Sequence, residues 1–580
     1  MSFRLSLDLE TWSVDHMWTM GKEFVRLAGL GRRDEHGLEI KTTTAIEKMI
    51  TLVNMAEPLI GHNLMGFDLP VLARLYGVDL HALVKAGRVR DTKIMASLAD
   101  PPPARISAAQ SERLYSLDTV SDKLLGDRKH GDLKALAKEF GGFEKIPVDD
   151  PRFVEYLRGD VLLTDELELV LPWTDYAQRE HEVAAIAAQI MINGFKVNAP
   201  MLYRRRDSIR EIRAGKIKIL QNDYGLPTHT KDGKKLASAP QNMDAGREAI
   251  RSAFFDLGAE YMPETPGGKP ATSVEAMDGM ILHYGHLPGV TELAETVKDL
   301  AGQRVIYETV SDHLHSDGRV HPAIQFRQSS GRWSVTKPGM TVMGKRDGKH
   351  VERAIFVADP GDLLVAFDLS QVDARAVAAL SGDVGYQELF APGRDIHTEV
   401  AQQIFGDPSM REVAKRISHG WNYGMGPNRI VAQNPRLVTP EIAFAFEDGM
   451  RRRFPRLVEW KAEVDAEAAS GRLLDNGFGR MMRPNPERSF TQGPALMGQG
   501  AARDIMMTGL LNLPSDILPM LRVQVHDEIV LSVPADAVED VRRTVLEAMQ
   551  FDCPIDPRVP ILADSSPAAP DWAGCYEKPS

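Results

Sequence analysis

Cysteine, long apolar runs and excess basic charge are all scarce in this sequence. Its 580 residues include only Cys553 and Cys575, which lack metal-ligand spacing, so neither a disulfide framework nor a structural zinc site is expected. No run of about 18 apolar residues occurs, and we expect no membrane-spanning helix. The first residues show no basic segment followed by an apolar one, which predicts a cytoplasmic protein without an export signal.

The composition is that of a folded chain with several domains. Hydrophobic residues make up 43% and charged residues 26% of a chain that is longer than one hydrophobic core usually organises. The net charge of −12 disfavours a phosphate-rich partner unless basic groups gather locally. Two basic clusters are present, one at Lys345, Arg346, Lys349 and Arg353 and one at Arg451, Arg452, Arg453 and Arg456. Taken alone, each is more typical of an ordinary solvated surface.

A strand that carries two carboxylates is predicted at the N-terminus. Residues 4–11 alternate strictly, with leucines on one side and polar residues on the other, as in a half-buried strand. The alternation places Asp8 and Glu10 on the same face. Because adjacent carboxylates repel each other unless a cation lies between them, this pair suits a divalent metal ion.

Two further groups of polar residues follow. Asn63 and Asp68 bracket a glycine-containing turn after an apolar stretch. Asp150, followed by proline, predicts the start of a helix on which Tyr156 and Asp160 are four residues apart. Those two side chains therefore share one helical face.

Together these residues resemble the three motifs of the DEDDy-type 3′→5′ proofreading exonuclease domain, which has an RNase H-like fold. The resemblance implies that residues 1–172 form such a domain and that it binds two metal ions. The implied metal ligands are Asp8, Glu10, Asp68 and Asp160, and Tyr156 is implied to orient the attacking water. Paired cations about 3.5–4 Å apart stabilise both the entering and the leaving oxygen of a phosphodiester.

A second acidic region is predicted in the C-terminal half. Residues 363–367 form an apolar run that predicts a buried strand with Asp368 at its end. Ser370 and Asp373 resemble a capping pair that begins a helix. In isolation, Asp368 is equally well explained as a simple turn residue.

A tight hairpin with an acidic tip is predicted further along. Apolar runs at residues 521–525 and 529–533 surround His526, Asp527 and Glu528. Since like charges at a tight turn are destabilising without a cation, this tip also suits a metal ion.

A row of functional side chains lies between the strand and the hairpin. Arg411, Lys415, His419 and Tyr423 follow one another at four-residue spacing, after Asp407 and a proline that predict a helix start. The first three share one helical face, because the row drifts only slowly around the helix. Such a face is suited to bind a triphosphate. The spacing alone does not distinguish it from an ordinary solvated basic face.

The C-terminal features resemble motifs A, B and C of the polymerase I-like family A DNA polymerases. The matching segments are residues 368–375, 411–424 and 525–528, together with Gly331–Arg332, Asp395–His397 and Gln499–Gly500. With the exonuclease motifs, the resemblance covers nearly the whole chain. It implies a template-directed DNA polymerase that extends a primer 3′-OH with dNTPs.

The resemblance also implies roles for individual residues. Asp368 and Asp527, with the Leu369 carbonyl, are implied to hold two Mg²⁺ ions, for which Mn²⁺ is a substitute, and Glu528 is a further implied catalytic residue. The implied nucleotide-binding residues are Arg411, Lys415, His419, Tyr423, Asp373 and Gln371. The implied DNA-binding residues are Arg332, Gln499, His526 and Gly424.

The implied architecture is an α/β (α+β) multidomain chain. An exonuclease domain is followed by a right-hand polymerase domain at residues 173–580, with the thumb at about 200–315, the fingers at about 385–490 and the palm in the remainder. The first motif begins at residue 8, so we expect no 5′-nuclease domain and a similarity to the short phage replicases. The segment 200–315 is too short for a thioredoxin-binding insertion, and no thioredoxin-type processivity factor is expected. The expected partners are primer–template DNA, dNTPs and a replisome helicase, primase or single-strand-binding protein, in a bacterial or phage-infected cell.

Two of the departures from the family pattern concern the sugar of the incoming nucleotide, and two alternative functions remain. Asp373 stands where the family usually has the glutamate that blocks a ribose 2′-OH, so either a shifted backbone closes this gate or ribonucleotides are excluded less strictly. His419 replaces the usual phenylalanine or tyrosine, which predicts intermediate acceptance of dideoxynucleotides. A repair-type polymerase fits the same motifs. A DEDD nuclease with a non-polymerising, nucleic-acid-binding C-terminal part would not need both Asp368 and Asp527.

Overall fold

The computed structural model describes residues 3–103, 108–129, 131–229, 233, 239–265, 267–302, 306–325, 328–344, 349–434 and 437–577. Lys345 and Arg346, from the first basic cluster, lie outside the described residues. The chain divides into two compact units, Met1–Lys196 with His315–Ser580 and Val197–Leu314. Both predicted catalytic regions belong to the first unit.

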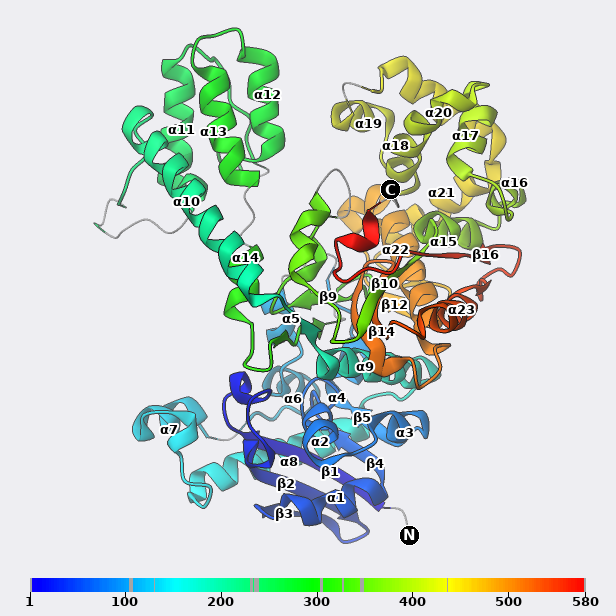
Figure 1. Ribbon diagram of the computed structural model, residues 1–580. Helices are drawn as coiled ribbons and strands as arrows, with labels where there is room; N and C mark the ends of the chain where they lie inside the picture. The colour runs from blue at the N-terminus through cyan, green and yellow to red at the C-terminus, as the bar shows by residue number, and fades with distance from the viewer. Residues whose placement is uncertain are drawn as a thin grey trace. The chain divides into compact units, whose positions relative to one another are not determined.

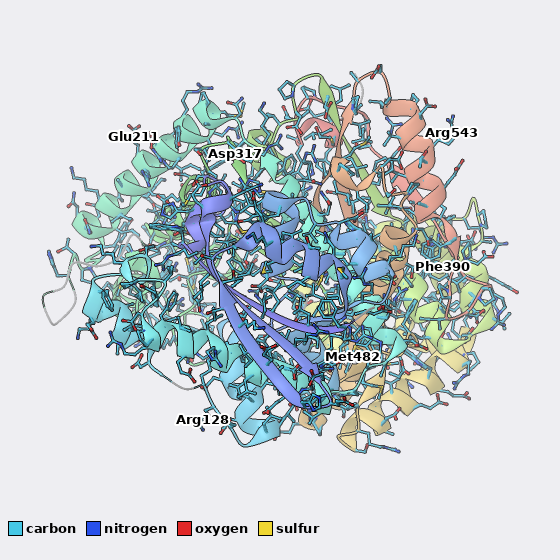
Figure 2. All side chains as sticks on the ribbon, turned by 90° about the horizontal axis from the view of Figure 1, so that it is seen from below. Arg128, Glu211, Asp317, Phe390, Met482 and Arg543 are labelled. Carbon is cyan, nitrogen blue, oxygen red and sulfur yellow. The ribbon has the colours of Figure 1, made fainter. Side chains whose placement is uncertain are left out.

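The first unit begins with a mixed five-stranded sheet, drawn in blue in Figure 1 and seen from below in Figure 2. Its strands are ordered β3 (Gly37–Thr43), β2 (Val25–Asp34), β1 (Phe3–Thr11), β4 (Ala56–Gly61) and β5 (Val89–Asp91). Strand β1 is antiparallel to β2 and parallel to β4, and its leucines are buried as the alternation predicts. The predicted carboxylates of β1 therefore lie on a central, rigid strand.

Eight helices lie between or after the strands of this sheet among the described residues. They are α1 (Ile46–Met55), α2 (Asp68–Tyr76), α3 (Leu80–Lys85), α4 (Thr92–Ala99), α5 (Ala108–Leu114), α6 (Leu117–Leu125), α7 (Leu133–Phe140) and α8 (Pro151–Val170). Helix α8 begins where the sequence predicts, because the Asp150 side chain accepts a 2.9 Å hydrogen bond from the Arg152 N–H. It packs against β1 and β2 and so brings its polar face to the carboxylates.

Helix α9 (Asp175–Asn193) lies between two hydrophobic cores. One face, with Ala184 and Ala188, belongs to the core of the N-terminal sheet. Another face, with Val183 and Ile186, belongs to the large core of the C-terminal half. This shared helix explains why residues on both sides of position 172 pack into one compact unit.

The second unit is helical, as predicted for residues 200–315. Its helices are α10 (Ala199–Asp223), α11 (Asp244–Asp256), α12 (Val274–Tyr284), α13 (Val290–Gly302) and α14 (Ile306–Asp312). The first four of these helices enclose a core of their own, which includes Phe254, Met277 and Leu293.

The C-terminal half is built around an antiparallel four-stranded sheet. Its strands are ordered β13 (Leu521–Val525), β14 (Glu528–Pro534), β10 (Asp362–Leu369) and β17 (Ala563–Ser565). The helices are α15 (Val372–Ser381), α16 (Val384–Gln387), α17 (Ile396–Phe405), α18 (Arg411–Asn422), α19 (Pro427–Gln433), α20 (Pro440–Arg453), α21 (Pro455–Ala469), α22 (Ser489–Leu511) and α23 (Val538–Met549). Short strand pairs are β6 (Phe195–Lys196) with β7 (Arg319–Val320), β8 (Ala323–Gln325) with β9 (Ser334–Thr336), β11 (Leu474–Asp475) with β12 (Met481–Met482), and β15 (Phe551–Asp552) with β16 (Pro560–Ile561).

Two predicted helix starts are wrong in detail. Ser370 and Asp373 do not cap α15, which begins after Gln371 without a side-chain cap, because Ser370 bonds Asp564 instead. Asp407 caps a 3₁₀ turn, Pro408–Met410, and α18 begins only at Arg411.

Candidate active sites

The first candidate site gathers four carboxylates from the N-terminal sheet and two helices. Asp8 and Glu10 lie on β1, and the N–H of Leu9 between them donates a 3.1 Å hydrogen bond to Oδ1 of Asp68, at the start of α2. Asp160 lies on α8, which packs against β1. The structure thus brings together the four acidic residues that the sequence predicts to act together.

Burial raises the pKa of every carboxyl group in this cluster, and repulsion from a neighbouring carboxylate adds to the rise in each case. For Asp8 the largest cause is burial, followed by the charges of Asp160, Asp68 and Glu10. Burial, with the charge of Asp160 next, raises the pKa of Glu10 to about 7. Burial is also the largest cause that raises the pKa values of Asp68 and Asp160. Carboxylates that repel one another in this way are stabilised by a bound cation.

Lys129, which the sequence interpretation missed, brings a positive charge to this cluster. Its Nζ donates hydrogen bonds to Oδ2 of Asp160 at 2.6 Å and to the hydroxyl of Tyr156 at 2.9 Å. The preceding residue, Arg128, is labelled in Figure 2. Oδ1 of Asp160 is buried and has no hydrogen-bond partner among the described residues. A lysine in a loop between two motifs has no spacing signal, so the sequence does not reveal this contact.

Asp91, to which the sequence interpretation assigns no role, holds the turn that carries Asn63. Its carboxylate accepts hydrogen bonds from the N–H groups of Asn63 at 3.0 Å, Met65 at 2.8 Å and Lys93 at 2.9 Å. Its own N–H donates to Nε2 of His181 on α9 at 2.8 Å. Asn63 has a φ of 65°, and these bonds stabilise the turn in that conformation. Asp91 is therefore a structural residue of the first site.

The donor atoms of the first site fit magnesium, which prefers carboxylate oxygens. Among the described residues, no three His, Cys, Asp or Glu side chains are already arranged around one point. Magnesium is usually bound by one or two carboxylates together with substrate phosphates and water, so a complete protein cage is not required. Oδ1 of Asp160, which is buried and has no hydrogen-bond partner among the described residues, is available as a ligand for such an ion.

The second candidate site lies where β10 meets the β13–β14 hairpin. Asp368 is directly opposite Glu528 in the antiparallel register, and the N–H of Leu369 donates a 2.9 Å hydrogen bond to the carbonyl oxygen of Asp527. His526, with a φ of 58°, and Asp527 form the tight turn. Asp368 at the end of β10 and Asp527 in the hairpin turn are 159 residues apart in the sequence, and the backbone hydrogen bond from Leu369 brings their segments together.

Glu528 takes part in a buried ion pair below this turn. Its Oε1 accepts a 3.0 Å hydrogen bond from Nη1 of Arg353 and another from the Tyr576 hydroxyl, and both partners of the ion pair are 3% exposed. Arg353 also lies over the Trp572 ring, 4.1 Å from its centroid. Arg353 therefore does not belong to a basic surface cluster, as the sequence suggested, and it anchors the hairpin.

Helix α18 presents the predicted basic row. Arg411 makes a two-bond ion pair with Asp395, the N-cap residue of α17, at 3.0 and 2.8 Å. Burial raises the pKa of Asp395, but hydrogen bonds from Arg411 and from the Thr398 N–H outweigh it and lower that pKa to about 2. Lys415 and His419 follow on the same helix, and the His419 ring meets Tyr423 edge-on at 5.1 Å.

Arg332, Asp373 and Tyr423 form a polar cluster beside a cavity of about 230 Å³. Nη2 of Arg332 donates to Oδ1 of Asp373. Burial, and next the charge of Asp373, raises the pKa of Tyr423. Arg332, Asp373, His526 and Asp527 all line the cavity. The fold therefore joins residues from motifs A and C around one space, and Tyr423 of motif B lies close to Asp373 at its edge.

Gln371, Gln499 and Gly424 are the remaining residues with predicted roles, and they lie on or beside the elements described above. Gln371 precedes α15 with a φ of 56°, and Gln499 lies half-buried on α22. Gly424, with a φ of 75°, approaches the backbone of Phe490 so closely that a Cβ would lie 2.4 Å from its carbonyl oxygen. Only glycine fits at this close approach.

Comparison with known proteins identifies the family. The model of DNA polymerase family A matches residues 231–573, which is more than half of the chain. The chain belongs to this family. It is 25% identical to the DNA polymerase of Mycobacterium phage D29, over 83% of this chain and 80% of that protein. It is also 28% identical to the thermostable DNA polymerase I of Thermus filiformis, over 82% of this chain and 59% of that protein, and 31% identical to that of Thermus aquaticus, over 59% and 43%.

The fold of this family A member also matches a solved structure. The POL domain of Pol1 from M. smegmatis, in complex with DNA primer-template and dNTP, has a TM-score of 0.73 and 18% identity, and the match covers 99% of this chain and 96% of that one. The predicted mixed α/β, multidomain architecture is thus confirmed. Among the described residues, no helix has the length and hydrophobicity needed to cross a membrane.

Proposed function

We propose that this family A member is a DNA-directed DNA polymerase that extends a primer with dNTPs and trims mispaired primer ends with a DEDDy-type 3′→5′ exonuclease. The observation that carries the proposal is that Asp368, at the end of β10, and Asp527, in the hairpin turn, lie on neighbouring segments linked by the hydrogen bond from the Leu369 N–H to the Asp527 carbonyl. The cavity beside them, lined by Arg332 and Asp373, leaves room for a substrate.

In this proposal the polymerase residues bind and orient the substrates. Asp368, Asp527 and the Leu369 carbonyl would hold two Mg²⁺ ions, and the ions would activate the primer 3′-OH and neutralise charge on the leaving pyrophosphate. Arg411 and Lys415 bind the β- and γ-phosphates as charge-assisted donors, and Arg411 exchanges its Asp395 partner for the phosphates.

The other side chains select the correct substrate. Tyr423 and His419 border the incoming nucleotide, and Asp373 with Gln371 faces its sugar. Arg332, Gln499 and His526, with Gly424 close by, contact the primer–template minor groove, where correct base pairs offer similarly placed acceptors. Glu528 supports this site from below through its Arg353 and Tyr576 contacts.

In the exonuclease, Asp8, Glu10, Asp68 and Asp160 would hold a second pair of ions, and Tyr156 would orient the attacking water. The raised pKa values of all four carboxyl groups support this proposal, since such a cluster is stable in its charged form only beside cations. Separate acidic sites for synthesis and trimming allow one chain to correct its own errors.

We also propose a role in phage replication. The relatives from mycobacteriophages D29 and L5 match this chain over 80% and 83% of their own lengths, at 25% and 24% identity. The match to the Thermus filiformis enzyme covers only 59% of that protein. The phage relatives are therefore matched over more of their own length than the Thermus filiformis enzyme is.

Primer extension from a mismatched end tests both activities. The wild-type chain should trim and then extend, Asp8→Ala should lose trimming, and Asp527→Ala should lose extension while it still degrades DNA. Asp15→Ala and Asp536→Ala, at exposed positions outside both sites, are matched controls that should behave as wild type. Trimming that survives Asp8→Ala, or extension that survives Asp527→Ala, would contradict the corresponding half of the proposal.

A further inference from the structure

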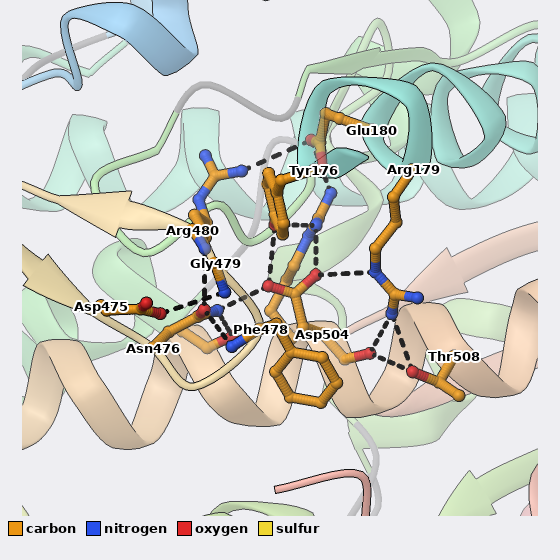
Figure 3. Close-up of polar contacts among 12 residues, drawn as sticks. Tyr176, Arg179, Glu180, Asp475, Asn476, Phe478, Gly479, Arg480, Asp504 and Thr508 are labelled. Carbon is orange, nitrogen blue, oxygen red and sulfur yellow. Dashed lines mark hydrogen bonds and ion pairs between the residues drawn. The ribbon is translucent and has the colours of Figure 1, made fainter. Parts of the chain in front are cut away.

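A buried ionic cluster joins α9, α22 and the β11–β12 hairpin, as Figure 3 shows. Its members are Tyr176, Arg179 and Glu180 on α9, Arg503 and Asp504 on α22, and Arg480 at the end of the hairpin loop. Glu180, Arg480, Arg503 and Asp504 are each at most 4% exposed. Neither the exonuclease motifs nor the polymerase motifs include this cluster.

Arg503 lies at the centre of the cluster. Its Nη2 donates to Oε1 of Glu180 at 2.7 Å, and its Nη1 donates to Oδ1 of Asp504 at 2.6 Å. The Tyr176 hydroxyl donates to the other Asp504 oxygen at 2.8 Å. Nη1 of Arg480 lies 3.5 Å from the Glu180 oxygen that already accepts from Arg503. One glutamate oxygen on α9 therefore faces guanidinium groups from two other elements.

A contribution to the stability of the fold does not by itself account for such a cluster of buried charges. Three arginines face two carboxylates, and Nε of Arg480 and Nε of Arg503 are buried without a hydrogen-bond partner among the described residues. Replacing buried ion pairs with apolar residues of similar volume is often neutral or stabilising. What the charged groups supply is a set of attractions, hydrogen bonds for Arg503 and a 3.5 Å ion pair for Arg480, that orients the elements carrying them.

Two arginines of the cluster connect it to the polymerase cavity, which is the cavity lined by Arg332 and Asp373. The Arg480 guanidinium lies against Gly331, where a Cβ would be only 2.5 Å from its Cζ. Gly331 has a φ of 76° and directly precedes Arg332, a lining residue of the cavity. Arg503 lines the same cavity itself. The Arg480 backbone is fixed in turn, since its N–H donates to Oδ1 of Asn476 at 3.2 Å.

We infer that Glu180 and Arg480 are positioning residues that hold Arg332 in place at the primer end. Glu180 orients the Arg480 guanidinium, the guanidinium supports the backbone at Gly331, and that backbone sets the direction of the Arg332 side chain. The consequence is specificity, because a well-placed Arg332 favours extension of a paired primer end over a mispaired one. This inference rests on the proposed polymerase function.

A double-mutant cycle between Arg480→Lys and Arg332→Ala tests the inference. Lysine keeps the positive charge but lacks the planar group beneath Gly331. Arg480→Lys should lower kcat/KM on a paired primer end about tenfold or more, since small misplacements of a substrate-contacting group have effects of this size, and it should narrow the preference for paired over mispaired ends. In the Arg332→Ala background the same change should have no further effect, because coupled residues are not additive.

A second cycle combines Glu180→Gln, which keeps the shape of the side chain and removes its charge, with Arg332→Ala. It replaces the first cycle if Arg480→Lys does not fold. Glu182→Gln, on the same helix but outside the cluster, is the matched control, and thermal unfolding identifies variants that lose activity only because they unfold. If the losses of activity in the cycle are additive, the inference is wrong and the proposed function is unaffected. A folded wild-type chain that does not extend primers would overturn the proposed function as well.

Discussion

Nζ of Lys129 lies 2.6 Å from Oδ2 of Asp160 and gives the cluster of four carboxylates a positive charge of its own. Lys129→Met should lower the free energy of unfolding in EDTA by about 1–3 kcal/mol, because a buried carboxylate loses its partner. The loss stays moderate, since the lysine side chain is 25% exposed and water screens part of the interaction. Chemical denaturation in EDTA measures this change.

Added Mg²⁺ should stabilise Lys129→Met more than it stabilises the wild type, because bound ions replace the missing charge. Lys134→Met, which removes an exposed lysine from α7, is the control and should show neither effect. If Mg²⁺ stabilises Lys129→Met and the wild type equally, Lys129 does not offset the negative charge of the metal-binding carboxylates.

The carboxyl group of Glu10 makes the stability of the metal-free protein depend on pH. Its pKa is raised from 4.5 to about 7, so between these pH values the folded protein holds a proton that the unfolded chain releases. Because the folded state binds more protons, the free energy of unfolding in EDTA should fall as pH rises from 4.5 to 7, by at most about 3 kcal/mol from this group. Unfolding curves across this range measure the slope.

Glu10→Gln should flatten that slope, since glutamine does not titrate, whereas Glu35→Gln at an exposed position should leave it unchanged. A metal-free wild-type protein that gains stability from pH 4.5 to 7 would contradict the prediction. Mg²⁺ should restore the lost stability at pH 8, where the ionised carboxylates bind it best.

Discrimination between sugars should depend on the length of the side chain at position 373. Asp373 is one methylene shorter than the glutamate usual in the family, and its carboxylate is held by Arg332. Asp373→Glu should increase the ratio of kcat/KM for dNTPs over rNTPs by about tenfold or more, since one methylene in a close-fitting site has an effect of this size. Single-nucleotide incorporation kinetics with each nucleotide type measure the ratio.

Asp536→Glu makes the same chemical change at an exposed position and should leave this ratio unchanged. If Asp373→Glu also leaves it unchanged, a shifted backbone already closes the gate in the wild type. The two explanations that the sequence leaves open are thereby separated.

The features that the sequence predicts correctly depend on local periodicity. Alternation along residues 4–11 is enough to place Asp8 and Glu10 on one strand face, and the spacing of Arg411, Lys415 and His419 is enough to place them on one helix. In both cases the backbone geometry repeats over a few residues, so no knowledge of distant parts of the chain is needed.

The features that it misses depend on contacts between distant residues. Lys129 reaches Asp160 across 31 positions, and Arg353 reaches Glu528 across 175. The same reason explains the wrong helix cap, because Ser370 is bonded to Asp564, 194 positions away. A local pattern cannot predict which distant partner will compete for a side chain.

The ion pair between Arg353 and Glu528 should be among the most sensitive positions of the polymerase sheet. Both side chains are 3% exposed, so Arg353→Met would leave the Glu528 carboxylate buried without its charged partner. The expected loss is about 3–5 kcal/mol of unfolding free energy, whereas Arg543→Met, which breaks an exposed pair with Asp540, should cost under about 1 kcal/mol. In Arg353→Met/Glu528→Gln no unpaired charge remains, and part of the loss should be recovered. Urea unfolding of the four proteins measures these differences, and a double variant no more stable than Arg353→Met would show that the buried charge is not the cause.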